Sequence, residues 1–202
     1  MEIHIYEPNS KVKAVLNKER VKLTDARALL LYGLYRLVRD GEFVSEFASE
    51  KLCYFFQRFG ANKIFNLKYS PNFYGPYSGK VRHVLYLLNG SYIKGYETKD
   101  KKPFDYLSMI LDAESEVTSY IKAKPELQDI AEKTCNFLEG YYSSFGLELL
   151  STVDFLAQEN NSSDLDEIKK AIGKWSDRKK SLFSNDRFIE KSINHLKSAQ
   201  LI

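Results

Sequence analysis

The stretch PELQDIAEKTCNFLEGY, residues 125–141, carries the pattern that decides the fold. One side of it repeats every three or four residues, which is the period of a helix that buries one face. The residues on that side are Leu127, Ile130, Ala131, Thr134, Leu138 and Tyr141. Pro125 suits a first helical turn, because the N–H that proline lacks has no partner there. The stretch therefore predicts a long amphipathic helix packed on a core.

The other side of this predicted helix is acidic, with Asp129, Glu132, Asn136 and Glu139 at helical spacing. The surrounding residues 104–163 contain 3 basic and 11 acidic side chains, although the whole chain has a formal charge of +3. A solvated helix face is the simpler interpretation. The alternative is a surface that imitates the phosphate charge of nucleic acid and occupies a basic groove on a partner. Further carboxylates nearby are Asp112, Glu114 and Glu116.

The helical period extends along the chain on both sides of this stretch. From Thr24, a typical N-cap, apolar residues recur until Asp40-Gly41 ends the pattern. Further helices are predicted at 52–59 with a stop at Gly60, at 78–88 with Ser78 as cap and Asn89-Gly90 as end, at 114–123, at 147–158, at 164–175 with Ser163 as cap, and at 185–198.

Short strand patterns interrupt these helices. Residues 64–69, 92–96 and 106–111 are strand candidates, and the last two flank a Lys-rich loop, so we expect them to form a small sheet or hairpin. A lone strand is predicted at residues 2–8. The predicted fold class is mainly α with a small β-sheet (α+β), in which a short hairpin or sheet lies between the early and the late helices.

Length and composition indicate a globular protein. With 202 residues, 23.4 kDa and 44% hydrophobic side chains, the chain can bury a substantial core. Cys53 and Cys135 lie in helical segments that look like core, so we expect buried free thiols and a reducing compartment. We find neither a long apolar run nor a signal peptide. These features predict a cytoplasmic protein with no membrane contact.

The sequence offers little support for catalysis. The three histidines, His4, His83 and His195, are scattered without metal-ligand spacing, and the chain contains no phosphate-binding glycine loop and no GxSxG motif. A Cys53/His83 nucleophile pair stays open beside packing roles for both residues. We therefore predict no catalytic residues, no metal and no cofactor.

An aromatic turn, Tyr74-Gly75-Pro76-Tyr77, precedes Arg82 and His83 by about one helical turn. Glycine allows an unusual backbone angle and proline fixes its own, so both tyrosines lie on a stiff loop. This loop either lines the core or is a recognition loop, in which rigid aromatic rings bind at low entropic cost.

Two basic segments require an interpretation. Residues 63–102 combine lysines with aromatic rings and could bind single-stranded nucleic acid, although a solvated basic face is the simpler hypothesis. Arg178-Lys179-Lys180 follows Trp175, and we interpret it as basic charge at a helix C-terminus, where the helix dipole favours it.

Several segments in register resemble one known family, the C-terminal domain of DarG antitoxins. They are residues 51–57 (KLCYFFQ), 74–78 (YGPYS), 82–85 (RHVL), 90–96 (GSYIKGY), 139–140 (EG), 145–153 (FGLELLSTV) and 175–179 (WSDRK). The resemblance covers most of residues 24–202. Residues 51–78 also show a fainter similarity to Panacea-type antitoxin domains. Residues 70–73 depart from the family pattern, which is commonly shorter there and contains histidine.

The resemblance implies a division of the chain. Residues 5–8 are similar to the end of the DarG macrodomain, so we interpret 1–22 as a remnant strand and linker from a missing N-terminal macrodomain and 23–202 as a toxin-binding antitoxin domain. In that family the macrodomain removes ADP-ribose from thymidine in DNA. The resemblance therefore implies that this chain is not an enzyme and keeps only the binding of a DarT-like toxin, an NAD-using enzyme that modifies single-stranded DNA.

Together these observations predict an antitoxin domain that binds and inhibits a DarT-like DNA ADP-ribosyltransferase by occluding its single-stranded DNA site. We expect no direct binding of nucleic acid. The alternative is a nucleic-acid-binding domain that uses residues 63–102. The partner-binding residues predicted for the antitoxin are Tyr74, Tyr77, Arg82, His83, Tyr92, Asp129, Glu132 and Glu139.

Overall fold

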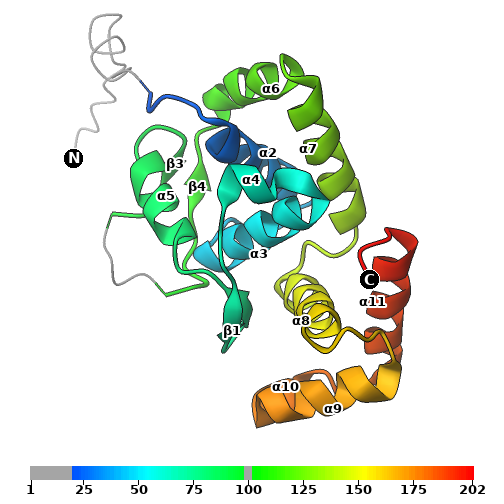
Figure 1. The fold of residues 1–202 in the computed structure, drawn as a ribbon. Coiled ribbons are helices and arrows are strands. Elements are labelled where there is room, and N and C mark those ends of the chain that lie inside the picture. Colours follow the sequence, from blue (N-terminus) through cyan, green and yellow to red (C-terminus); the bar gives the residue numbers. More distant parts are fainter. Residues whose placement is uncertain (1–19, 98–101) are drawn as a thin grey trace, which may run out of the picture.

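The computed structural model describes residues 20–97 and 102–202 (Figure 1). This part of the chain is mainly helical, which confirms the predicted fold class. Its helices are α2 (Asp25–Arg39), α3 (Glu46–Phe56), the π-helix η1 (Gln57–Ala61), α4 (Asn62–Phe65), α5 (Val81–Leu88), the 3₁₀-helix η2 (Leu111–Ala113), α6 (Glu114–Lys122), α7 (Pro125–Leu138), α8 (Ser144–Asn160), α9 (Leu165–Trp175), α10 (Asp177–Leu182) and α11 (Asp186–Ser198). The strand predicted at 2–8 lies outside the described residues.

Two small antiparallel sheets are present in the described part. Strand β1 (Ser70–Asn72) pairs with β2 (Gly75–Tyr77), with Ser70 opposite Tyr77. Strand β3 (Ile93–Lys94) pairs with β4 (Ser108–Met109), which confirms the hairpin expected between 92–96 and 106–111. The strand predicted at 64–69 is wrong, because its first two residues belong to α4 and the strand begins only at Ser70.

Gly60 was predicted to end a helix, and the structure corrects this. Its φ of +112° bends the chain inside η1, and the helix resumes as α4. The segment after α4 needs no strand partner, because the side chain of Gln57 meets both backbone groups of Leu67. The Leu67 N–H donates to Oε1 of Gln57 (2.7 Å), and Nε2 donates to the Leu67 carbonyl (3.1 Å). The side chain of Gln57 thus provides the two hydrogen bonds that a neighbouring strand would otherwise make with Leu67.

Three predicted helix caps can be compared with the structure. Thr24 caps α2 as predicted by accepting from the backbone N–H of Arg27 (3.4 Å). Ser78 does not cap α5, since Lys80 precedes the helix and the hydroxyl of Ser78 binds Glu50 instead. Asp164, one residue after the predicted Ser163, caps α9.

Helices α2, α3 and α4 lie at the centre, with α6 and α7 on one side and α5 with the β3–β4 sheet on the other (Figure 1). Helix α8 connects this group to α9 and α11, since it packs against α3, β2, α9 and α11. Every residue from Gly146 to Ala157 is buried. Within the described residues, none of the helices is long and apolar enough to cross a bilayer.

Helix α7 follows the predicted pattern. Leu127, Ile130, Ala131, Thr134 and Leu138 are buried, and the polar side chains between them face solvent. The helix ends at Leu138, so Tyr141 lies just beyond it, half-buried against the core.

Candidate partner-binding site

The aromatic turn forms the β1–β2 hairpin, and its glycine is required for two reasons. Gly75 has a φ of +97°, in the left-handed region. A Cβ at this position would lie 3.0 Å from Nζ of Lys51 and 3.1 Å from Oγ1 of Thr152. The hairpin therefore packs its backbone directly on polar groups of α3 and α8, which holds the turn rigidly.

A pocket of about 240 Å³ lies between this hairpin and α3. Its lining residues are Glu46, Phe47, Glu50, Lys51, Asn72, Phe73, Tyr74, Gly75, Tyr77 and Pro103. The two glutamates occupy one face of α3 at positions i and i+4. The pocket thus combines aromatic walls with buried acidic and basic groups.

Both glutamates accept hydrogen bonds from the segments around the pocket. Glu46 accepts from the hydroxyls of Tyr77 (3.0 Å) and Tyr96 (2.5 Å). Burial and this carboxylate raise the pKa of Tyr77 to about 12. Glu50 accepts from the hydroxyl of Ser78 (3.1 Å) and from the backbone N–H of Gly79 (3.1 Å), while burial raises its pKa. These bonds fix the path of the chain from the hairpin into α5.

Lys51 is fully buried beneath the hairpin. Its ammonium group donates to the carbonyl of Pro76 (2.7 Å). Burial, followed by the nearby positive charge of Lys179, lowers the pKa of Lys51 to about 7. Near neutral pH this side chain is therefore divided between its charged and neutral forms.

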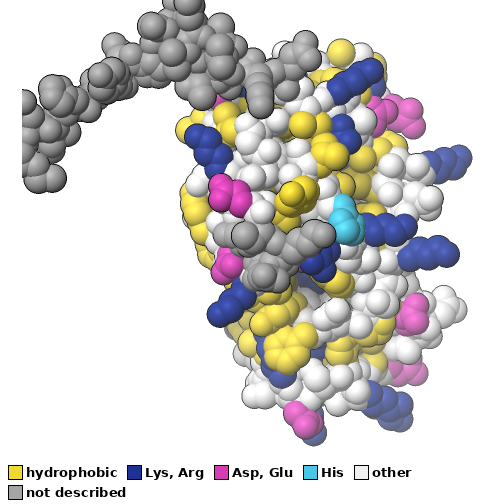
Figure 2. Space-filling view, turned by 90° about the vertical axis from the view of Figure 1, so that its left-hand side faces the viewer, with side chains coloured by type: hydrophobic (Ala, Val, Ile, Leu, Met, Phe, Trp, Pro, Cys, Tyr) yellow, Lys and Arg dark blue, Asp and Glu magenta, His cyan; other side chains and the backbone are white. Residues whose placement is uncertain are grey.

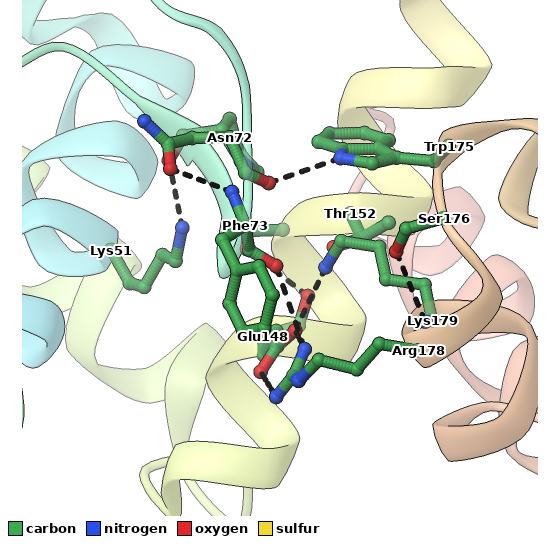
Figure 3. A network of polar contacts seen from close by, with 11 residues as sticks. Lys51, Asn72, Phe73, Glu148, Thr152, Trp175, Ser176, Arg178 and Lys179 are labelled. Atoms are coloured by element: carbon green, nitrogen blue, oxygen red, sulfur yellow. Dashed lines mark hydrogen bonds and ion pairs between the residues drawn. The ribbon is translucent and has the colours of Figure 1, made fainter.

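Glu148 on α8 is the centre of a second buried cluster (Figure 3). Arg178 holds both of its oxygens (2.6 and 3.1 Å), and Nζ of Lys179 donates to Oε1 (2.8 Å). Lys179 also donates to Thr152 (3.2 Å). The ion pairs bring the pKa of Glu148 below its usual value although burial alone would raise it.

The same cluster attaches the C-terminal helices to the hairpin. The guanidinium of Arg178 lies 4.9 Å from the ring centroids of both Phe73 and Tyr74. The indole N–H of Trp175 donates to the carbonyl of Asn72 (3.0 Å). These contacts join residues about a hundred positions apart in the sequence.

Residues 178–180 were interpreted as basic charge at a helix C-terminus, and Lys179 and Lys180 do lie in the last turn of a helix, although of a separate short one. Ser176 caps a new helix, α10, and accepts from the N–H of Lys179 (3.2 Å). Arg178 and Lys179 both lie in this helix and reach Glu148 on α8. The sequence offered one signal for this cluster: Glu148 stands inside the apolar run Leu147–Leu150, and a buried carboxylate requires partners.

Tyr74 and Tyr77 both line the pocket and are half-buried, so the structure brings these two predicted residues together. Arg82 is half-buried and His83 is exposed, both on α5. Tyr92 is fully buried, and its hydroxyl donates to Glu116 (2.9 Å). The ring of Tyr92 is thus a core element that a partner does not reach in this conformation.

The acidic residues of α7 lie apart from the pocket and are absent from its lining. Asp129, Glu132 and Glu139 are exposed. Asp129 pairs with Lys133 (2.7 Å), and Glu132 accepts from Gln128 (2.7 Å), both on the helix surface. The predicted partner-binding residues therefore occupy two separate surfaces.

The acidic excess of residues 104–163 is partly internal. Besides Glu148, Asp154 is buried and holds Arg58 (2.8 Å) and the hydroxyl of Tyr54 (2.6 Å). The acidic surface that remains is concentrated on α6 and α7.

The basic segment 63–102 is more exposed. Lys63, Lys68, Lys80, Lys94 and Lys102 all lie at the surface. Figure 2 shows the face on the left of Figure 1, where Lys and Arg side chains are scattered among apolar ones. The predicted absence of nucleic-acid binding stays a prediction.

A Cys53/His83 nucleophile pair does not fit the geometry. Cys53 is buried, and burial raises its pKa well above the usual value, whereas a nucleophilic thiolate needs a lowered pKa. His83 is exposed on α5. Cys135 is also buried and unpaired, so both predicted buried thiols are confirmed. Within the described ranges, no group of three His, Cys, Asp or Glu residues could hold a metal ion.

Comparison with known proteins gives relatives but no family model, since none matches the chain. A protein of Thermus aquaticus named DNA ADP-ribosyl glycohydrolase is 30% identical over 184 residues, which cover 89% of this chain and 49% of the relative. Proteins of the same name from Mycobacterium bovis and Mycobacterium tuberculosis are each 25% identical over 197 residues, covering 91% of this chain and 55% of the relative. The chain therefore spans about half the length of the curated relatives it matches.

These relatives overturn one prediction. We expected a chain that is not an enzyme, but the proteins matching about nine tenths of it carry the name of an enzyme. The resemblance to DarG proteins is supported by the same finding. This chain is related to proteins named DNA ADP-ribosyl glycohydrolase.

Proposed function

We propose that this chain binds and inhibits a DarT-like DNA ADP-ribosyltransferase toxin by covering the toxin's single-stranded DNA site. The observation that carries the proposal is the exposed row of carboxylates on α7 and at its C-cap, namely Asp129, Glu132 and Glu139. The relationship to DNA ADP-ribosyl glycohydrolases agrees with the resemblance to DarG antitoxins, in which such a domain binds the toxin.

The row on α7 has dimensions that suit a substitute for a DNA strand. Asp129 and Glu139 are separated by ten residues, or ~15 Å along a helix axis. This length corresponds to about four nucleotides at the ~3.4 Å rise of one DNA strand. A groove that binds phosphates with Lys and Arg side chains would find negative charge spread over a comparable length along α7.

The partners of these carboxylates are easily exchanged. The Asp129–Lys133 pair is exposed on both sides, and such surface pairs contribute only ~0–1 kcal/mol. A cation from another protein can therefore replace Lys133 at little cost. The half-buried Tyr74 and Tyr77 at the hairpin are proposed as a second, shape-determining contact.

Co-expression of the toxin with variants of this chain tests the proposal. The triple variant Asp129→Asn, Glu132→Gln, Glu139→Gln should lose protection, and calorimetry should show a Kd weakened at least about tenfold. The matched control is Glu159→Gln, Glu167→Gln, Glu190→Gln, which removes the same charge from exposed positions of α8, α9 and α11. Equal protection by both variants would show that α7 does not contact the toxin.

A second candidate function is the activity that the relatives' name states. Glycosidic bonds are commonly hydrolysed by two carboxyl groups, one of which has a raised pKa. Glu46 and Glu50 line the hairpin pocket, and burial raises the pKa of Glu50. An assay for ADP-ribose released from ADP-ribosylated single-stranded DNA tests this function. Release that is lost in Glu50→Gln would support it, and no release by the unmodified chain would exclude it.

A further inference from the structure

Arg36 on α2 presents a buried donor that has no acceptor. The residue is half-buried, and its Nε atom is shielded from solvent yet meets no hydrogen-bond partner among residues 20–97 and 102–202. Buried polar atoms in native proteins are almost always satisfied, and an exception often indicates a missing ion or water. This atom is therefore available to a hydrogen-bond acceptor that lies beside it.

A pocket of about 260 Å³ lies next to Arg36, between α2 and α6. Its lining residues are Tyr32, Tyr35, Arg36, Arg39, Glu114, Thr118 and Lys122. The spacing of these residues explains their convergence. Arg36 and Arg39 are one turn apart on α2, and Thr118 and Lys122 are one turn apart on α6, which packs on α2.

The pocket opens into a shallow polar groove of about 460 Å³ along α6. The two share Arg39, Glu114, Thr118 and Lys122, and the groove adds the hydroxyl groups of Ser115 and Ser119. Asp112 also lines the groove and forms an ion pair with Arg20 (2.8 Å). A ligand held at Arg36 could therefore extend toward solvent past hydroxyl donors.

The charge of the pocket favours an anion. Three cationic side chains line it against one carboxylate, Glu114, which is already paired with Arg39 (2.5 Å). The hydroxyl of Tyr35 donates to the carbonyl of Ile110 (2.7 Å) and carries no negative charge that would balance the cations. Glu132 on α7 contributes to the raised pKa of Tyr32, and it is absent from the residues that line the pocket.

We infer that this α2–α6 pocket binds a phosphate group, with Arg36 and Lys122 as its cationic ligands and Thr118 as a hydroxyl donor. The planar guanidinium fork of arginine matches the oxygens of phosphate, and lysine adds a point charge. The enclosed volume is below the ~300–1,000 Å³ of pockets that hold whole drug-sized ligands. It fits one or two phosphate groups, with the rest of a larger ligand lying in the groove. This inference does not depend on toxin binding.

Calorimetry with the whole chain at constant ionic strength tests the site with four probes: sodium phosphate, sodium pyrophosphate, a ten-residue oligothymidylate and sodium acetate. Phosphate or pyrophosphate should bind and raise the Tm. Arg36→Gln should weaken that binding at least tenfold while folding normally, because it removes a donor that has no acceptor. The matched control is Arg187→Gln, which removes the same charge from an exposed position of α11. Lys122→Gln, at the exposed rim, gives a second variant in case Arg36→Gln misfolds.

The probes also separate the possible sources of the phosphate. Binding of the free anions assigns a small phosphorylated ligand, and Arg36-dependent binding of the oligonucleotide alone assigns the phosphate to a nucleic-acid backbone. The inference is overturned if none of the phosphate probes binds, if acetate binds as tightly, or if Arg36→Gln and Arg187→Gln weaken binding equally.

Discussion

The buried cluster around Glu148, which lies beside the hairpin, and helix α7 both contain several charged residues, but they hold them in opposite ways. In the cluster, Glu148 is buried and bonded to Arg178 and Lys179 of the same chain. On α7, Asp129 and Glu132 lie in solvent with only surface partners. Burying a charge is costly unless it is paired. The charges of the Glu148 cluster are therefore needed to keep the chain folded, whereas those of α7 are free to bind another molecule.

The largest expected effect comes from removing the centre of the buried cluster. Glu148→Ala leaves Arg178 and Lys179 without their carboxylate, so we expect the free energy of unfolding to fall by about 3–5 kcal/mol in urea denaturation. Glu159→Ala, at an exposed position of the same helix, should change it by less than about 0.5 kcal/mol. A similar small loss for both variants would mean that burial does not distinguish the two charges.

A smaller loss should follow from crowding the hairpin. In Gly75→Ala the new Cβ combines backbone strain with the close approach to Lys51, so we expect a destabilisation of about 2–3 kcal/mol. Gly90 also has a positive φ, +82°, but open space around it. Gly90→Ala should therefore cost only the strain, about 1 kcal/mol. The difference between the two values in thermal or urea unfolding measures the hairpin contact, and equal losses would argue against it.

Lys51 should make stability depend on pH. Its pKa is about 7 in the folded chain and near 10.5 when unfolded, so between these values the unfolded state binds more protons. Stability should rise with pH in this range and lose that contribution as pH falls toward 7. Measured against Lys51→Met, which cannot titrate, the gain between pH 7 and pH 9.5 should be about 3 kcal/mol. Parallel pH profiles for the two proteins would contradict the lowered pKa.

The smallest effect on stability is expected at α7. Neutralising Asp129, Glu132 and Glu139 should change the free energy of unfolding by less than about 0.5 kcal/mol per substitution. The same variant should flatten the salt dependence of toxin binding, because fewer charges then attract the partner. A large loss of stability would mean that these side chains stabilise the fold in the same way as the buried charges of the Glu148 cluster.

Most of the fold could be predicted because its long helices follow one period. Helix α7 shows this best, since its buried and exposed residues separate cleanly. Some short elements could not be predicted. Gly60 is a typical helix end in sequence and becomes a stop or a kink only through tertiary packing. Helix α10 has only six residues, too few for a period to emerge.

The candidate site was predictable only in part. The stiff turn at Tyr74–Tyr77 follows from its glycine and proline. Its anchors, Lys51 and Lys179, are indistinguishable from surface lysines in a linear pattern, because the partners of their ammonium groups, Pro76 and Glu148, lie 25 and 31 positions away. Tyr92 was expected at an interface for its aromatic character alone, which suits a core equally well.

The indole contact with Asn72 gives the molecule a built-in optical reporter. Trp175 is the chain's sole tryptophan, and its N–H meets the hairpin at the junction with the C-terminal helices. Emission from this one fluorophore should shift when the junction loosens and stay constant while α7 alone is occupied. An unlabelled sample could therefore reveal which of the two surfaces a ligand has touched.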